Sequence, residues 1–113
     1  LTVQAAVAAQ LWEKIGLTRE EGVAALAPMM RQVSINLSTS GIPGAVAGPY
    51  ARGDIGTVRK HIDALLAYAP EILPLYRELA LAGLPFALEK KTLTEDRAAD
   101  IQFLLEQFRG DAK

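Results

Sequence analysis

The feature that most restricts the fold is the spacing of apolar residues, which repeats every three or four positions. Val3, Val7, Leu11 and Ile15 follow one another at four-residue intervals, which is the spacing of one helix face. No segment alternates apolar and polar residues for long enough to form a strand. Half of the residues are apolar but only 6% are aromatic, so closely packed aliphatic side chains must build the core. We therefore predict an all-α bundle of about five helices.

Capping residues mark where the later helices begin. Thr18 and Glu21 have the spacing of a capping box, which opens a second helix. Asp54 and Thr94 are predicted to cap the third and fifth helices. A fourth helix is expected at roughly 70–90, with Pro85 bending or breaking it. The tail at 110–113 is predicted to fray.

Each predicted helix has a predicted buried face. On the second helix the stripe consists of Val23, Leu26, Ala27, Met30, Val33 and Leu37. On the third it consists of Ile55, Val58, Ile62, Leu65 and Ala69. On the fourth it consists of Ile72, Leu75, Tyr76, Leu79, Gly83 and Phe86, and on the fifth of Ala98, Ile101, Leu104, Leu105 and Phe108.

The stretch from 39 to 53 is predicted to be a long loop, because it holds four glycines and two prolines. Long ordered loops in compact domains are often functional. The loop closes in GPYARGD, residues 48–54, which we call the 48–54 segment. Its Arg-Gly-Asp tripeptide matches adhesion ligands by chance, because the aspartate is about to be fixed at a helix start.

The best candidate site surrounds the start of the third helix. Asp54, Thr57 and His61 fall on one flank at offsets of three and seven, and Arg52 enters from the loop just before them. A helix N-terminus with a nearby arginine favours an anion, and Gly48, Pro49 and Gly53 shape the backbone there. In the alternative interpretation, Asp54 caps the helix and itself occupies the amides that an anion would need.

Two further polar residues are candidates of lower specificity. His61 is the only histidine, so it is either a general acid or base or an ordinary helix residue. Asn36, near the end of the second helix, either contacts a ligand or satisfies nearby backbone groups. No metal site is predicted, because the chain has no cysteine and only this one imidazole.

Charge and hydropathy exclude two classes of partner. Twelve basic residues stand against thirteen acidic ones without a basic block, so nucleic-acid binding is not expected. The apolar opening, residues 1–12, is too short to span a bilayer, and no membrane partner is expected. The absence of cysteine suggests a cytoplasmic location. Because helical periodicity is already running at Leu1, we expect a single domain that forms the C-terminal part of a longer protein.

Three stretches carry a family resemblance: GLTREEGVAALAPMMRQ (16–32), AGPYARGD (47–54) and TVRKHIDALLAYAPEILPLYRELA (57–80). They resemble the C-terminal helical domain of an uncharacterised bacterial family of Rossmann-like oxidoreductases. That domain is similar to the C-terminal domains of 6-phosphogluconate dehydrogenase, ketopantoate reductase and pyrroline-5-carboxylate reductase relatives. The most specific part of the match is the 48–54 segment with Thr57 and His61 behind it.

The resemblance implies a domain that dimerises and forms the substrate side of a cleft. The parent protein would then carry an N-terminal Rossmann domain that binds NADP, and the isolated chain, which holds no cofactor of its own, would be inactive. Catalytic residues do not carry over, because the only lysine of the first helix, Lys14, lies at its far end. A function of a different class stays open, namely a free-standing helical module that binds a small anionic ligand at the 39–54 loop.

Overall fold

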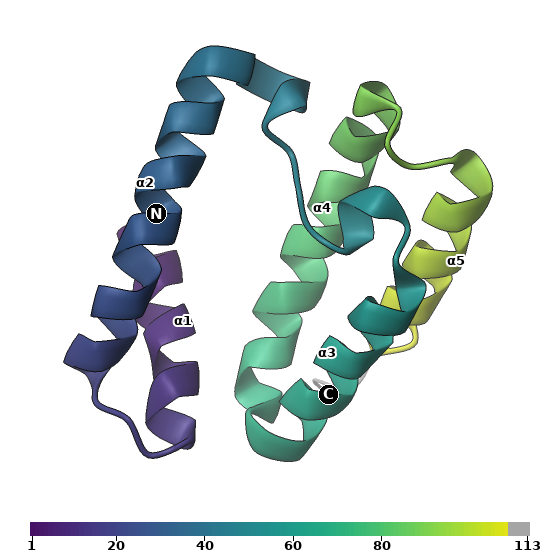
Figure 1. Cartoon of the computed structure of the whole chain (residues 1–113). Coiled ribbons are helices and arrows are strands. Elements are labelled where there is room, and N and C mark those ends of the chain that lie inside the picture. Colours follow the sequence, from purple (N-terminus) through teal and green to yellow (C-terminus); the bar gives the residue numbers. More distant parts are fainter. Residues whose placement is uncertain (109–113) are drawn as a thin grey trace. The chain divides into compact units, whose positions relative to one another are not determined.

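The computed structural model describes residues 1–108 and contains five α-helices, two short 3-10 helices and no strand within that range (Figure 1). The predicted all-α fold is therefore confirmed. The chain divides into two compact units, Leu1–Gly41 and Ile42–Lys113, which we call unit 1 and unit 2. The tail predicted to fray, 110–113, lies outside the described residues.

Unit 1 is a hairpin of two antiparallel helices, α1 (Thr2–Lys14) and α2 (Arg19–Gly44) (Figure 1). The last residues of α2, 42–44, belong to unit 2. The capping box predicted between them is present. The Thr18 amide donates to Glu21 Oε1 at 2.8 Å, and the Glu21 amide donates to Thr18 Oγ1 at 3.1 Å. These reciprocal bonds satisfy two amides that a helix start leaves free.

The two helices of unit 1 approach each other closely at one place. Small residues permit this approach, since Ala9 and Gly22 are both buried there. A Cβ atom added at Gly22 would lie 3.2 Å from atoms of Ala9 and Trp12. Further along the hairpin the helices leave an apolar groove of about 290 Å³ between them. The groove is lined by Leu1, Gln4, Ala5, Ala8, Leu26, Met30, Val33, Ser34 and Leu37.

The stripe predicted as the buried face of α2 is not buried. Val23, Met30, Val33 and Leu37 are all exposed, between 39% and 54%. Two helices meet along only one narrow seam, so a hairpin leaves most of its apolar side chains in contact with solvent. The sequence pattern correctly predicted the helix, but within unit 1 no third helix covers this face.

The long loop predicted for 39–53 is wrong in its first part, because α2 continues to Gly44. Thr39 lies in this added part of the helix, and its Oγ1 donates to the Ile35 carbonyl at 3.0 Å. Glycine weakens a helix by only about 1 kcal/mol relative to alanine, which a long preceding helix tolerates. The connection that remains, 45–54, contains a 3-10 turn, η1 (Tyr50–Arg52).

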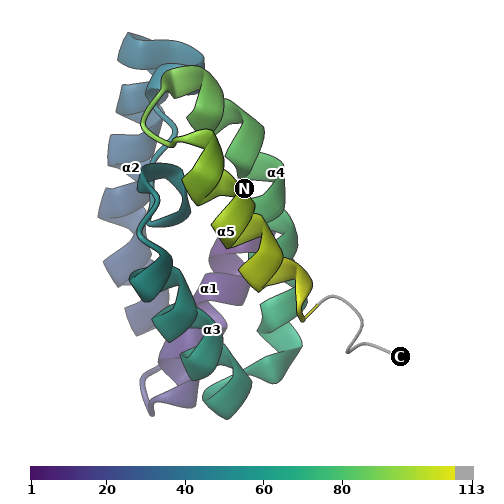
Figure 2. The same cartoon turned by 90° about the vertical axis from the view of Figure 1, so that its right-hand side faces the viewer.

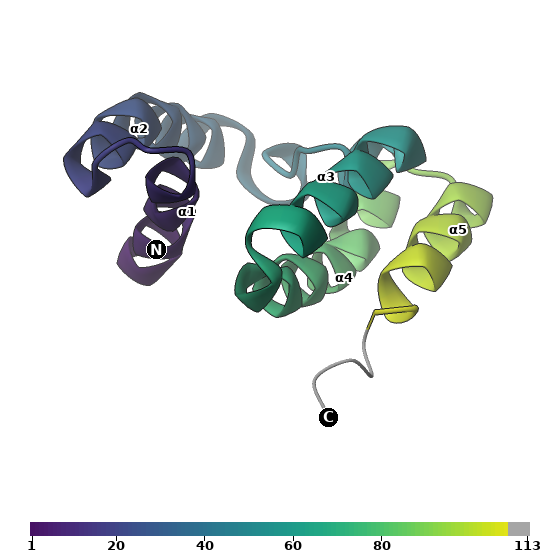
Figure 3. The same ribbon diagram turned by 90° about the horizontal axis from the view of Figure 1, so that it is seen from below.

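Unit 2 is built on three helices, α3 (Ile55–Tyr68), α4 (Leu73–Lys90) and α5 (Glu95–Glu106). Each contacts the other two, and together they form a triangle in cross-section (Figure 3). A second 3-10 turn, η2 (Pro70–Ile72), joins α3 to α4. The predicted caps are confirmed, because the side chains of Asp54 and Thr94 accept from the amides of Thr57 and Arg97.

The core lies where α3, α4 and α5 meet. Its largest fully buried side chains are Val58, Ile62, Ile101 and Leu105. The faces predicted for α3 and α5 agree with this core except at two residues. Ile55 is 36% exposed at the first turn of α3, and Phe108 is half-buried beyond the end of α5. Figure 2 shows α5 beside α4 and α3.

The first residue of the face predicted for the fourth helix, Ile72, is buried as predicted, but along α4 the face is wrong by about one residue. The helix buries Leu73, Arg77, Ala80, Leu84 and Ala87, whereas three members of the predicted face are exposed. They are Leu75 at 38%, Leu79 at 47% and Phe86 at 44%. The helix is apolar on several sides, so periodicity alone does not select the side that packs.

Prolines inside the helices do not end them. Of the two outcomes predicted at Pro85, a bend or a break, the break does not occur, because α4 is continuous from Leu73 to Lys90. Likewise α2 is continuous past Pro28. No described helix combines the length and the apolar character needed to cross a membrane.

Candidate functional site

The 48–54 segment forms a compact turn that leads into α3. Gly48 and Gly53 both adopt positive φ, at 121° and 76°, a conformation that side chains other than glycine rarely adopt. Between them lies η1, and the Asp54 amide donates back to the Pro49 carbonyl at 3.0 Å. The glycines are therefore needed for the shape of the turn itself.

Three side chains from the end of α4 and the start of α5 hold this turn in place. Lys90 Nζ donates to the Val46 carbonyl at 2.7 Å, and Thr92 Oγ1 to the Ala51 carbonyl at 2.8 Å. Arg97 donates to the Gly53 carbonyl at 3.0 Å. The carbonyls of Ala51 and Gly53 in the segment, and that of Val46 just before it, are thus paired with side chains of unit 2.

Tyr50 packs its ring against α4 at the place where that helix has a glycine. A Cβ atom added at Gly83 would lie 2.6 Å from Tyr50 Oη and from its ring carbon Cε2. Burial raises the pKa of the Tyr50 phenol above its ordinary value. The sequence analysis missed this contact, although a glycine inside an otherwise strong helix is a signal of close approach.

Asp54 is committed to the start of α3. Its Oδ1 accepts from the Thr57 amide at 3.1 Å, and its Oδ2 accepts from Thr57 Oγ1 at 2.7 Å. The hydrogen bond from the Thr57 side chain, followed by that from its amide, lowers the pKa of the Asp54 carboxyl. Arg52 Nη2 lies 3.9 Å from Asp54 Oδ2, and the Arg52 side chain is 62% exposed. The capping interpretation is thus confirmed, and the structure brings Arg52, Asp54 and Thr57 together.

His61 follows Thr57 by one helical turn and has a partner that the sequence analysis did not predict. Its Nδ1 lies 3.0 Å from Tyr76 Oη, and the two rings meet edge to face at a centroid distance of 5.8 Å. Burial raises the pKa of the Tyr76 phenol. His61 precedes Ala69 by eight residues and Tyr76 follows it by seven. Residues at nearly equal distances along the chain from the turn of a helical hairpin lie beside each other on the two helices. This spacing is the signal that predicts the His61–Tyr76 pair.

The remaining candidate, Asn36, belongs to unit 1. Its side-chain oxygen accepts from Gln32 Nε2 at 3.0 Å along one exposed face of α2. This bond joins neighbouring turns of one helix, so it does not indicate a ligand site. Among residues 1–108, no group of three or more histidine and carboxylate side chains gathers in a way that could hold a metal ion.

These features define a class of protein, an all-α domain. Its glycine-rich turn, the 48–54 segment, is hydrogen-bonded to the rest of unit 2 and leads into the polar flank of α3. The chain belongs to the family described as Domain of unknown function (DUF2520), whose model matches residues 1–82. The match includes α1, α2, α3, the 48–54 segment and Tyr76, and it ends within α4. No curated protein and no solved structure matches the chain. The expected membership of an uncharacterised family is confirmed, whereas the relation to oxidoreductases stays a prediction.

Proposed function

We propose that this chain is the dimerising, substrate-side domain of an NADP-dependent oxidoreductase-like protein. Unit 1 supplies the contact with a second copy, and the flank of α3 in unit 2 faces the substrate. The nucleotide is bound by an N-terminal Rossmann domain of the parent, so the chain has no activity alone. The observation that carries the dimer is the exposed apolar surface of unit 1.

Unit 1 exposes far more apolar side chain than it buries. Ala9 and Gly22 are its buried residues. Ten large apolar side chains of the same unit are exposed: Leu1, Val3, Ile15, Leu17, Val23, Met29, Met30, Val33, Ile35 and Leu37. Four of them, Leu1, Met30, Val33 and Leu37, line the same groove, and an exposed apolar patch of this kind marks an interaction site. An isolated helical hairpin also has little stability without such cover.

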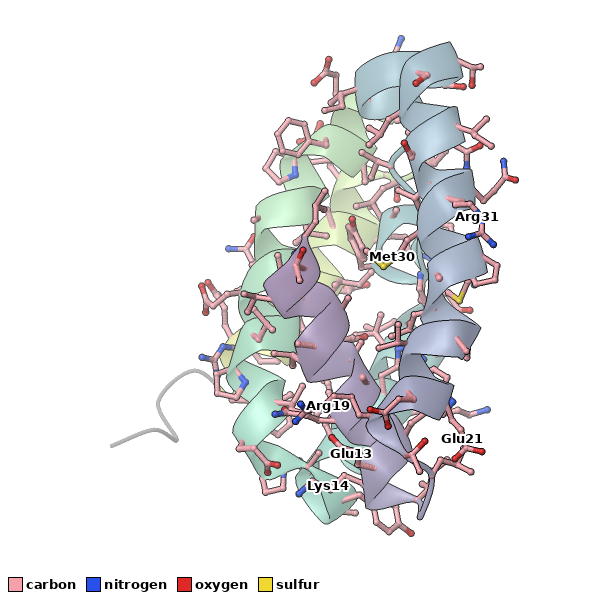
Figure 4. All side chains as sticks on the ribbon, turned by 90° about the vertical axis from the view of Figure 1, so that its left-hand side faces the viewer. Glu13, Lys14, Arg19, Glu21, Met30 and Arg31 are labelled. Carbon is pink, nitrogen blue, oxygen red and sulfur yellow. The ribbon has the colours of Figure 1, made fainter. Side chains whose placement is uncertain are left out.

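Charged residues in unit 1 are confined mainly to the turn between its helices. Glu13, Lys14, Arg19 and Glu21 gather at this end, and Arg31 is the only charge farther along α2 (Figure 4). Figure 4 also shows Met30 pointing from α2 toward the side of α1, where it lines the apolar groove. Depletion of charge with enrichment of methionine is typical of an interface core.

The size of the hairpin suits a second copy. A stable interface takes about 20–30 residues from each partner, and the exposed positions of unit 1, taken over all sides of its two helices, reach that number. Two copies of one surface can meet about a two-fold axis, which is the commonest arrangement of homo-oligomers. Away from the turn between the helices, Arg31 is the one charged residue of unit 1, so few like charges can oppose each other across the axis.

Sedimentation equilibrium from low to high micromolar concentration tests the dimer. We expect dimerisation of the wild type, and Val33→Glu to raise the dissociation constant at least ~10-fold because it buries an unpaired carboxylate. Leu66→Glu is the matched control. Leu66 is an apolar residue on α3 that is 42% exposed, which is comparable to the 54% exposure of Val33. A wild type that is monomeric at high micromolar concentration would overturn the dimer.

The oxidoreductase part of the proposal is tested separately. The coding sequence upstream of Leu1 should encode a strand followed by Gly-x-Gly-x-x-Gly at the start of a helix. The parent protein should then bind NADPH, seen as a change in its fluorescence, and the isolated chain should not. An upstream sequence without this motif would contradict the assignment while leaving the dimer intact.

The anion-binding module is the second candidate, and the exposed Arg52 is the observation in its favour. Against it, the Asp54 carboxylate occupies the Thr57 amide, and part of the predicted loop belongs to α2. Titration of the chain with phosphate, compared with Arg52→Ala, decides the matter. Binding that requires Arg52 supports the module, and binding indifferent to Arg52 removes it.

A further inference from the structure

We propose that Tyr76 fixes the ring of His61 so that its Nε2–H is a permanent hydrogen-bond donor, which binds a carboxylate or carbonyl oxygen of the ligand. His61 would then recognise an oxygen atom and would not act as a base. The inference about the ligand rests on the proposed function, whereas the inference about the ring does not.

The direction of the hydrogen bond follows from the chemistry of the two groups. Across the 3.0 Å contact, either the Tyr76 phenol donates to His61 Nδ1 or the reverse. A phenol is the stronger acid of the two donors, and an unprotonated imidazole nitrogen is the stronger acceptor. The bond O–H···Nδ1 is therefore favoured, and it requires the proton of the neutral imidazole to sit on Nε2.

The surroundings support the same direction. Tyr76 is half-buried, and burial raises the pKa of its phenol, so the hydroxyl keeps its proton. Among the described residues, His61 is the hydrogen-bond partner found for that hydroxyl. His61 itself is exposed, so Nε2, on the ring edge opposite Nδ1, is accessible to a ligand.

The result for recognition does not depend on the charge of the ring. In the neutral form with Nδ1 occupied, Nε2 carries the proton, and in the imidazolium form both nitrogens carry one. In either form Nε2 donates and cannot accept. An oxygen acceptor such as a carboxylate or carbonyl therefore fits, and an ammonium group does not.

The test uses the fact that His61 is the only histidine, so its ring signals need no assignment. Long-range ¹H–¹⁵N spectra are recorded at about pH 8.5, where an ordinary imidazole is neutral. We expect the Nε2–H tautomer, with the Nδ1 shift displaced upfield by its hydrogen bond. In Tyr76→Phe, which keeps the ring packing, we expect loss of that displacement. A ring protonated on Nδ1 in the wild type would overturn the proposal.

The ligand part is tested on the same samples with sodium acetate as the probe. Acetate should shift the Nε2 and Hε1 signals of the wild type in a saturable way, and methylammonium chloride at equal ionic strength should not. Tyr76→Phe should reduce the acetate shift, while backbone spectra show that its fold is unchanged. Unmoved His61 signals in acetate would overturn oxygen recognition here, whatever the oligomeric state or NADPH binding of the protein.

Discussion

The two units of this chain use similar helices in different ways. Unit 2 surrounds Val58, Ile62, Ile101 and Leu105 so fully that each is less than 2% exposed. Unit 1 has apolar residues at the same helical spacing but leaves Val33 54% exposed. Three mutually contacting helices enclose a core, and two do not. The difference teaches that periodicity determines the element, whereas burial depends on how many elements surround it.

The comparison is most strongly tested by one substitution made in both units. Ile101→Ala empties a fully buried site of unit 2, and such changes cost about 2–5 kcal/mol. Ile35→Ala removes the same atoms from a side chain that is 54% exposed on α2, and at a dilution that keeps the chain monomeric it should change stability by less than ~0.5 kcal/mol. Urea unfolding measures both values. Equal losses would contradict the distinction between the units.

A second pair of substitutions tests close packing within unit 2. Gly83→Ala places a methyl group 2.6 Å from the Tyr50 ring and should cost about 1–3 kcal/mol through overpacking. Gly56→Ala is the control, because a Cβ atom there would lie 3.8 Å from its nearest neighbour, Asp54 Oδ1. It should be neutral or stabilising by up to ~1 kcal/mol. In a Tyr50→Ala background the cost of Gly83→Ala should disappear. If the cost persists there, the clash is not its cause.

Helix caps give a smaller effect of the same kind. Thr94→Ala removes the cap of α5 in unit 2 and should lower the free energy of unfolding by about 0.5–2 kcal/mol. Thr18→Ala removes the equivalent cap of α2 in unit 1. It should leave the unfolding transition of unit 2 unchanged and instead speed the amide exchange of α2. A loss of unit 2 stability from Thr18→Ala would mean that the units unfold together.

The smallest expected effect is a dependence on acid. The pKa of the Asp54 carboxyl is lowered in the folded state. Its contribution to the free energy of unfolding is therefore complete above the pKa that the same carboxyl has in the unfolded chain. It is lost as the pH falls through the folded value. Urea midpoints measured from neutral pH downward should therefore fall less steeply in Asp54→Asn than in the wild type below about pH 4. Parallel curves for the two proteins would contradict this role of Asp54.

The sequence predicted the elements well, because capping and periodicity are local properties. Thr18, Asp54 and Thr94 were assigned correctly as caps, and the buried faces of α3 and α5 follow the predicted spacing apart from Ile55 and the half-buried Phe108. The predicted face of α4 failed because that helix offers two adjacent apolar faces. Its core-facing side even carries Arg77, only 7% exposed, whose guanidinium donates to Glu78 and to the Phe108 carbonyl. No local pattern predicts a buried arginine.

The candidate site was predicted in part. Arg52, Asp54 and Thr57 do converge. Helix geometry relates Asp54 to Thr57, three positions apart, without knowledge of the tertiary fold, and Arg52 is only two residues from Asp54. The partners of the site escaped prediction because they come from elsewhere in the chain: Tyr76 from α4, and Thr92 and Arg97 from beyond it. Such contacts depend on how helices pack.

Amide hydrogen exchange at two protein concentrations tests most directly whether the units differ as described. If a second copy covers unit 1 at high micromolar concentration, as we propose, the α1 and α2 amides should be protected there. At low micromolar concentration their protection should fall at least ~10-fold, and that of α3, α4 and α5 should not change. Protection of α1 and α2 that equals that of α3 to α5 and is independent of concentration would contradict the account.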